Sequence, residues 1–595
     1  TPPNPGTATS PAYANTSPIV INYSGASDET GGSGLKTVEL WFKKGMSGAW
    51  TNSGQSLTTA SGSFNFTGMT GDDTYYFDLR AQDNAGNWSD TPSGDGDCHT
   101  LYVDGGTSST GRVTIQTEYL YPGAYAKRST VYDENGINVK QVSVNYGLEA
   151  EVLSTSGDVQ QASVVYDALY RVKSLTDPNN QQTSYIYDLS GNLTQINLPG
   201  GETVQIPDHD DCGRVTRAID SKGQEVTYEY NDPSNLLTAI RYTNNSTYDT
   251  SIYYDAVYGR CTSWSDKEGT TSYTYDDRGA VTSTTTSYTN GPQNKTISAS
   301  FYDNGSVNIL ATPDGNFTFT YDAAGRVVGL LDSRNAAFSW SYLDNDRLET
   351  QVSPVTTATY TYNPRGQITS LTNRLTGGTL LSQFGSATTP LSYDALGNLL
   401  SSIVDIPSVS LLSGTTSYDY NSLDELTLEA STRNGGYSFP FIYNGAGNPT
   451  TFKGVTHDFD SVKNQRTDTG FIYDANGNPT TYKGISGLEY DPNNHLVTYP
   501  GTLTAGYHGG LRAWKQTGTG RTYFLYAGIV PVCEMNSSGT VTAVNTAGPN
   551  GLLARHEGMN TVFYTFDDGG DVTQTLNSSG TVLSTELYDA YGNRL

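Results

Sequence analysis

A short turn motif recurs along most of this 595-residue chain, and it constrains the fold more than any other feature of the sequence. At Tyr321 the residues read Tyr-Asp-Ala-Ala-Gly-Arg, between a Thr/Phe alternation and an apolar run. Alternating residues on both sides of a turn are typical of a β-hairpin. Gly325 can adopt a positive φ, and Asp322 can accept hydrogen bonds from the turn backbone. We therefore predict strand, turn and strand, with Tyr321 opposite Val327 across the hairpin.

The motif occurs in tandem. Successive tyrosines are commonly about 20 residues apart, a period typical of repeat architectures in which each unit packs against its neighbours. Degenerate copies keep the spacing, and in some of them Asn replaces Asp in the turn. The turn residues of the clear copies are Tyr187, Asp188, Gly191, Tyr275, Asp276, Gly279, Tyr321, Asp322, Gly325, Arg326, Tyr393, Asp394, Gly397, Tyr473, Asp474, Gly477, Tyr588, Asp589 and Gly592.

These tandem Tyr-Asp-x-x-Gly-Arg/Asn motifs resemble the YD-repeat, or Rhs, family, which includes bacterial Rhs toxins, the C subunits of insecticidal toxin complexes and the teneurins. The resemblance covers residues 110–595 and rests on the number of copies. It implies a ribbon of β-hairpins coiled into a hollow shell or tube. In toxin-bearing relatives a self-cleaving core motif and a variable toxin follow the repeats. The resemblance therefore implies that here both would lie beyond residue 595.

The first 105 residues have a different pattern. Short alternating segments at a spacing of about ten residues are typical of a β-sandwich. The segment 83–88, Asp-Asn-Ala-Gly-Asn-Trp, resembles a late-strand turn of bacterial Ig-like and fibronectin-III-like modules. We predict an all-β chain with an Ig-like sandwich at 1–105 and a YD-repeat shell at 106–595. The predicted sandwich strands are 19–23, 38–42, 62–66 and 75–80.

Charge and hydropathy exclude several classes of function. The chain has 33 Lys and Arg against 60 Asp and Glu, a net charge of -27. Nucleic acids and anionic membranes require a basic face, so neither is an expected partner. No apolar run is long enough for a membrane-spanning helix. A Thr/Ser/Asn-rich, Lys-poor composition is typical of extracellular proteins, so we expect an extracellular or cell-surface location.

The four cysteines, Cys98, Cys212, Cys261 and Cys533, are far apart and include no Cys-x-x-Cys pair, which gives a zinc site little support. Cys212 and Cys261 occupy comparable positions at the turns of two different repeats. A disulfide between them and isolated thiols both stay open.

An acidic group at Asp83, Asp95 and Asp97 could bind calcium, whose ligands are carboxylate and carbonyl oxygens. Asp residues in loops more often stabilise the turn itself by hydrogen bonds to its backbone. No other cofactor is expected.

Candidate catalytic residues are few. Cys533 and His556 are the nearest nucleophile and base, but a dyad needs hydrogen-bond geometry and an oxyanion hole. The carboxylate pair Asp567-Asp568 could suggest glycoside hydrolysis, yet it lies at a predicted turn where Asp is common. The sequence contains no phosphate-binding loop and no metal-ligand spacing of His. We therefore predict no catalytic site.

Tyrosine is the commonest aromatic residue, with 44 copies. On the faces of strands its rings either pack between hairpins or stack on sugar rings. About 40 strands spaced about 4.8 Å apart would make a ribbon about 190 Å long, which closes roughly one turn. Such a ribbon favours an arc or short ring over a sealed container. The segment 376–389 is predicted to project from it as a loop.

The sequence predicts a non-enzymatic, secreted or cell-surface structural protein. Its copies, or further segments of the same polypeptide, would associate into a filament or tube, because the terminal strands of a ribbon have unpaired edges. Two alternatives stay open. The chain could form the delivery shell of an Rhs-type toxin, or it could be a surface adhesin that binds cell-surface glycans.

Overall fold

The computed structural model describes residues 2–11, 13–14, 18–29, 31–45, 48–69, 73–94, 96–102, 114–121, 124–132, 138–146, 152–230, 235–518, 520–549 and 551–595. Contacts divide the chain into two units, Thr1–Ser143 and Val144–Leu595. The predicted domain boundary at residue 105 lies outside the described residues. No helix within the described ranges is long and apolar enough to cross a membrane.

The first unit contains two sheets that pack around one core. One sheet has the order β1-β3-β6 and the other the order β2-β8-β7-β4-β5. Ile21 and Phe66 from the first sheet meet Val38 and Phe77 from the second. The four predicted strands are confirmed, whereas the likeness to an Ig-like module stays a prediction. The strands are β1 Thr7–Thr9, β2 Tyr13–Ala14, β3 Ile19–Ser24, β4 Leu35–Lys44, β5 Thr51–Leu57, β6 Gly62–Phe66, β7 Asp73–Asp83 and β8 Cys98–Tyr102.

Three further strands follow the sandwich: β9 Thr114–Tyr121, β10 Ala124–Tyr132 and β11 Asn138–Tyr146. β10 pairs antiparallel with both β9 and β11.

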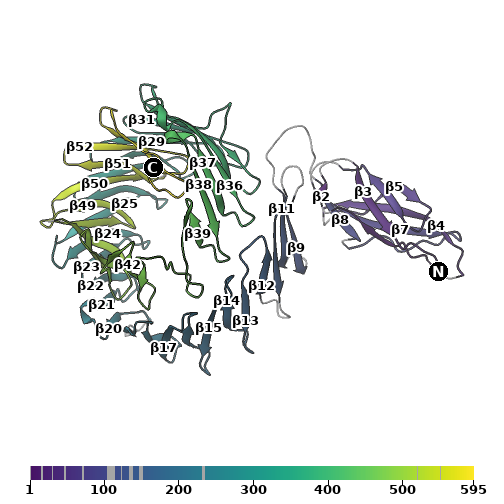
Figure 1. Ribbon diagram of the computed structural model, residues 1–595, viewed down its shortest axis with the longest axis horizontal. Helices are drawn as coiled ribbons and strands as arrows, with labels where there is room; N and C mark the ends of the chain where they lie inside the picture. Colours follow the sequence, from purple (N-terminus) through teal and green to yellow (C-terminus); the bar gives the residue numbers. More distant parts are fainter. Residues whose placement is uncertain are drawn as a thin grey trace. The chain divides into compact units, whose positions relative to one another are not determined.

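The second unit begins with the predicted ribbon of antiparallel strands, here called the first layer, residues 152–456. The strands follow an arc from β13 through β17 and β25 to β36 and β39 (Figure 1). Most strands pair with the next along the chain, and β35 pairs with both β33 and β34. The strands are β12 Val152–Gly157, β13 Ser163–Tyr166, β14 Val172–Thr176, β15 Gln182–Tyr187, β16 Leu193–Asn197, β17 Thr203–His209, β18 Val215–Ile219, β19 Glu225–Glu229, β20 Ala239–Tyr242, β21 Thr250–Tyr254, β22 Cys261–Asp266, β23 Gly269–Tyr275, β24 Val281–Tyr288, β25 Lys295–Phe301, β26 Val307–Thr312, β27 Gly315–Tyr321, β28 Val327–Leu331, β29 Ala337–Tyr342, β30 Leu348–Val352, β31 Thr356–Tyr362, β32 Ile368–Leu375, β33 Leu380–Phe384, β34 Ser392–Tyr393, β35 Leu399–Asp405, β36 Gly414–Tyr420, β37 Leu426–Ser431, β38 Tyr437–Tyr443, β39 Pro449–Phe452 and β40 Val455–Thr456.

The hairpin predicted at Tyr321 is confirmed. β27 and β28 pair with Tyr321 opposite Val327, and the register shifts by one residue at the turn. The turn glycines have the predicted positive φ: Gly191 96°, Gly325 83°, Gly397 105° and Gly477 85°.

Replacing Gly325 by Val should destabilise the second unit by about 1–2 kcal/mol, because a β-branched residue is strained at positive φ. A Cβ at Gly325 would meet no atom within 4 Å, so the loss would come from the backbone conformation rather than from a clash. Gly377 is the matched control, since it has the same open surroundings without a positive φ. Urea unfolding of the two variants measures the difference, and equal losses would contradict this assignment.

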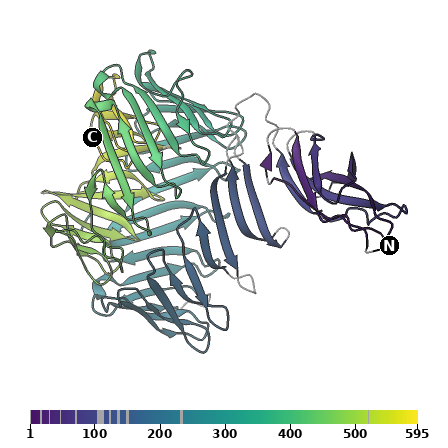
Figure 2. The same cartoon turned by 45° about the vertical axis from the view of Figure 1, so that its right-hand side comes forward.

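The last part of the chain, residues 457–595, is a second layer with its own sheets. Its strands are β41 Ile472–Tyr473, β42 Pro479–Tyr482 and β43 Ile485–Ser486 in a small sheet, then β44 Glu489–Tyr490, β45 Leu496–Tyr499, β46 Leu503–His508, β47 Leu511–Thr517, β48 Gly520–Ala527, β49 Val530–Met535, β50 Val541–Gly548, β51 Gly551–Glu557, β52 Asn560–Phe566, β53 Val572–Asn577 and β54 Val582–Thr585 in an 11-stranded sheet. Figure 2 shows this sheet, in yellow, beside the teal and green strands of the first layer. Phe338 and Phe384 of the first layer share one buried core with Val544 and Phe563 of the second.

The second layer follows the first in the same direction along the chain. Residues 464–590 of the second layer therefore cover the same arc that residues 179–429 form in the first layer. Hydrogen bonds join Asn179 to Asn464 at 2.7 Å, Asp220 to Asn476 at 2.6 Å, Tyr242 to Asn493 at 2.7 Å, Asp266 to His508 at 2.7 Å, Asp332 to Thr546 at 2.8 Å, Asn373 to Phe566 at 2.8 Å and Glu429 to Ala590 at 2.9 Å.

Two expectations from the sequence are wrong here. The hairpins do not form one continuous single-turn ribbon, because the last strands leave the ribbon and bury apolar side chains of the first layer. The segment 376–389 is not a projecting loop. It contains strand β33, whose Phe384 is 2% exposed in the core between the layers.

Candidate functional site

The repeat turn is held by its own Asp and Arg. Asp322 accepts hydrogen bonds from the backbone nitrogens of Ala324 at 3.0 Å and Arg326 at 2.9 Å, and from the Arg326 Nε at 2.7 Å. The bond from the Arg326 backbone, and next the bond from its side chain, lower the pKa of Asp322. The carboxylate is therefore a fixed part of the turn.

The tyrosine and arginine of one motif also bind the neighbouring hairpins. The Tyr321 hydroxyl donates to the carbonyl oxygen of Val307, 2.9 Å away. The Arg326 guanidinium lies over the ring of Tyr342, 4.9 Å from its centroid. The same carbonyl contact recurs for Tyr187, Tyr275, Tyr362 and Tyr393. These repeat tyrosines serve packing between hairpins.

In the second layer, turn residues of the motif also attach to the first layer. Asp474 forms an ion pair with Lys222 at 3.1 Å. Asp589, whose side chain is fully buried, pairs with Lys453. Tyr591 of the last turn packs against the rings of Phe441 and Phe452. The last repeat is therefore fixed to strands β38 and β39.

Cys533 and His556 do not form a dyad. The ring nitrogens of His556 bond Asp332 at 2.7 Å and Thr561 at 2.9 Å. Strand β50 lies between the strands that carry Cys533 and His556. Burial raises the pKa of the Cys533 thiol to about 11, which keeps it protonated and a poor nucleophile at neutral pH.

All four cysteines are free thiols, so no disulfide joins Cys212 to Cys261.

The calcium candidates are engaged within the sandwich where they are described. Asp83 accepts from the backbone and side-chain nitrogens of Asn87, each at 2.8 Å, and Asp97 accepts from the Ala8 nitrogen at 2.8 Å. Asp95 lies outside the described residues. No group of three potential metal ligands occurs in the part of the chain that the structure describes, and calcium binding stays a prediction.

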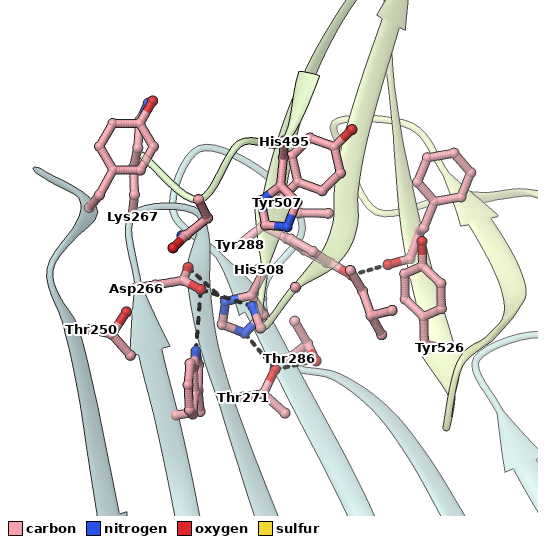
Figure 3. A pocket seen from close by; sticks show the side chains of 18 of the residues that line it. Thr250, Asp266, Lys267, Thr271, Thr286, Tyr288, His495, Tyr507, His508 and Tyr526 are labelled. Atoms are coloured by element: carbon pink, nitrogen blue, oxygen red, sulfur yellow. Dashed lines mark hydrogen bonds and ion pairs between the residues drawn. The ribbon is translucent and has the colours of Figure 1, made fainter. Parts of the chain in front are cut away.

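A cavity of about 820 Å³ lies between the two layers, and no sequence motif indicated it. Figure 3 shows its lining. Strands β22 to β24 contribute Trp264, Thr271, Tyr273, Thr284 and Thr286, and the second layer covers them with Asn493, His495, Tyr507, His508 and Tyr526. Local spacing could not reveal this site, because the two halves lie more than 200 positions apart in the sequence.

His508, which lines this cavity, links the two layers (Figure 3). Its Nδ1 lies 2.7 Å from Asp266, and its Nε2 lies 2.9 Å from the Thr271 hydroxyl. Burial raises the pKa of Asp266, but the hydrogen bond with His508 and its charge outweigh burial, so the pKa lies below its usual value. The carboxylate is therefore ionised beside the imidazole.

The order carboxylate, imidazole, hydroxyl is that of a catalytic triad. The same order recurs at Asp332, His556 and Thr561, where the carboxylate and imidazole are 1% and 3% exposed in the core between the layers. Recurrence at two crossings between the layers indicates that both groups are structural joints.

The carboxylate pair singled out in the sequence lies in a turn of the second layer. Asp567 accepts from the backbone nitrogens of Gly569 at 3.0 Å and Asp571 at 2.8 Å, as expected for a turn Asp. Burial and the neighbouring Asp568 raise the pKa of Asp567 to about 7. The folded chain thus holds a proton there that the unfolded chain, with a pKa of 3.8, releases at lower pH.

This shift predicts a loss of stability as pH rises from about 4 to about 7, since the folded state binds more protons in that window. Replacing Asp567 by Asn should abolish the loss and stabilise the second unit at pH 8 by about 2–4 kcal/mol, with little effect at pH 4. Asn fits the turn, since Asn363 and Asn444 hold the same place in other copies. Urea unfolding at both pH values measures the effect.

Asp188 provides the control for this prediction. It holds the same turn position in the first layer, but hydrogen bonds from Asn192 lower its pKa. The change Asp188→Asn should therefore destabilise the chain at pH 8. A pH dependence that is the same for both variants would contradict the role of Asp567.

Residues 166–203 match the RHS repeat family model. A comparison with curated protein sequences finds no match.

Solved structures share the fold along the chain. The crystal structure of TcdB2-TccC3-Cdc42 has 14% identity and a TM-score of 0.66, and the match covers 99% of this chain and 35% of that chain. For TcdB2-TccC3 the identity is 15% and the TM-score 0.66, and the match covers 99% of this chain and 36% of that chain. For a Photorhabdus luminescens Tc holotoxin pore with a TccC3 mutation the identity is 14% and the TM-score 0.62, and the match covers 99% of this chain and 35% of that chain.

This chain therefore spans about a third of the length of the solved chains that it matches. The tandem turns, the matched repeat and the shared fold agree: the chain contains an RHS repeat at 166–203 and has the fold of these solved structures.

Proposed function

We propose that this chain forms part of the wall of a non-enzymatic β shell that encloses a polypeptide. The proposal rests on one observation: the wall consists of two packed layers of β-sheet. The second layer follows the first from Asn179 to Glu429, and between Tyr288 and Ile406 the first layer shares an apolar core with it. A sheet covered in this way is a stiff barrier, because its strands and apolar side chains are held from two sides.

The likeness to the Tc toxin structures supports a role in enclosing a polypeptide rather than the assembly into a filament that the sequence predicts. Those chains are about three times as long, so this chain would supply one section of a larger wall. None of the candidate catalytic groups has the geometry of an active site. The wall would therefore act by excluding proteases and solvent from the enclosed chain.

A protease-protection experiment tests this function. An unstructured reporter peptide with several trypsin sites is fused after Leu595, where the last repeat is anchored to the first layer. We expect trypsin to cut this reporter at least about tenfold more slowly than the free peptide, because cleavage requires an exposed chain. The same reporter fused before Thr1 is the control and should be cut at the rate of the free peptide. Equal cleavage at both positions would contradict the proposal.

A secreted or cell-surface location and assembly into a filament or tube stay predictions. β54 has a partner strand on one side only within the described sheet, so it provides an edge to which another chain could add. Light scattering of the full chain at rising protein and salt concentration tests assembly. Uniform monomers under all conditions would contradict it.

A further inference from the structure

We propose that the cavity between the layers binds a short, uncharged oligosaccharide. Its volume, about 820 Å³, is within the range of small-molecule sites. Aromatic rings line it from both layers, among them Trp264 and Tyr273 from the first and Tyr507 and Tyr526 from the second. Aromatic faces stack on the apolar faces of sugar rings, whereas sugar hydroxyls require hydrogen-bonding groups beside them.

Such hydrogen-bonding groups are present in the cavity. Tyr273 and Thr284 lie opposite each other on β23 and β24, and both line the cavity. No described residue forms a hydrogen bond with the hydroxyl of either one. The side-chain oxygen of Asn493 accepts from Tyr242 at 2.7 Å, which leaves its amide NH₂ to donate. The cavity thus offers two hydroxyls and an amide to a ligand.

The charges of the lining indicate an uncharged ligand. Asp266 pairs with His508 at 2.7 Å, and Asp491 pairs with His495 at 3.0 Å. The Lys267 ammonium donates to the Tyr248 hydroxyl at 2.9 Å and lies over its ring. Each ionisable Asp, His and Lys of the lining therefore already has a partner in the wall. A charged ligand would have to compete with these partners.

The strand pairing argues against a peptide in this cavity. Extended peptides commonly bind by adding a strand to a free sheet edge. β23 has partners on both sides, and so has β48 in the covering sheet. Neither of these two strands offers a free edge, so recognition along them has to come from side chains, as it does for a sugar.

Isothermal titration of the full chain with the neutral trisaccharides maltotriose, cellotriose and chitotriose tests the site. We expect at least one to bind, and each of the variants Tyr273→Phe and Thr284→Val to weaken it by about fivefold to tenfold, as expected for one lost hydrogen bond. Tyr185→Phe is the matched control. Tyr185 holds the same place two residues before a motif tyrosine, but it lies outside the cavity and should leave the affinity unchanged.

Three results would overturn the proposal. They are no binding of any trisaccharide, an affinity that both cavity variants leave unchanged, or an affinity that Tyr185→Phe weakens as much as Tyr273→Phe does. Circular dichroism and melting of each variant confirm that the chain is folded. Uncharged peptides of similar size are titrated in parallel, and if they bind while no trisaccharide does, the first of these results identifies a peptide site instead. The result is independent of the protease-protection experiment, which measures the wall rather than the cavity.

Discussion

Replacing Asp332 by Ala is expected to destabilise the second unit by about 3–5 kcal/mol, because it leaves two buried polar groups without their hydrogen-bond acceptor. Asp332 is 1% exposed and joins the layers by accepting hydrogen bonds from His556 at 2.7 Å and Thr546 at 2.8 Å. Its removal leaves the imidazole of His556 and the hydroxyl of Thr546 buried without their acceptor. Urea unfolding followed by fluorescence measures the loss.

The control is an exposed ion pair of the first layer. Asp346 lies 2.7 Å from Arg326, with 75% of its side chain exposed. Asp346→Asn should cost less than about 1 kcal/mol, since Asn also tolerates the positive φ of this residue and solvent screens such pairs. If the two variants lost equal stability, the group at Asp332 would not be a joint between the layers.

Truncating Phe563 to Ala is expected to cost the second unit about 3–5 kcal/mol, because a large core side chain leaves a cavity that closes only in part. Phe563 is 3% exposed, and its ring lies 6.2 Å from that of Phe338 across the layers. The first unit has a separate core, in which Phe77 is fully buried. Calorimetry should therefore show two transitions, with Phe563→Ala lowering one and Phe77→Ala lowering the other.

This experiment also tests the division into two units. Each variant is the control for the other, since both remove a buried phenylalanine. A single transition that both substitutions shift together would contradict separate cores.

Local features of the fold could be predicted from the sequence. The turn at Tyr321, the pairing of Tyr321 with Val327 and the positive φ of Gly325 depend on residues within one hairpin. Their chemistry is visible in a window of a few residues. The strands of the sandwich followed from the same alternation.

The second layer could not be predicted in this way. Its strands carry the same kind of alternation as the ribbon, so the sequence pattern does not say whether a hairpin extends the first sheet or packs on it. The decisive contacts join residues such as Asp266 and His508, which are 242 positions apart. The cavity depends on the same contacts, and for that reason sequence reasoning missed it. No single strand contains the pattern of a binding site.

The direction in which the layers run has a consequence for how the protein folds. The sequence separation between partners falls from 285 at Asn179 and Asn464 to 161 at Glu429 and Ala590. During synthesis from the N-terminus, the first layer is therefore complete before its partners leave the ribosome. Each new hairpin then docks on a surface that already exists, and the loop that it closes becomes shorter at every step. Growth in this order would lower the kinetic barrier that such distant contacts impose on a chain refolding from denaturant.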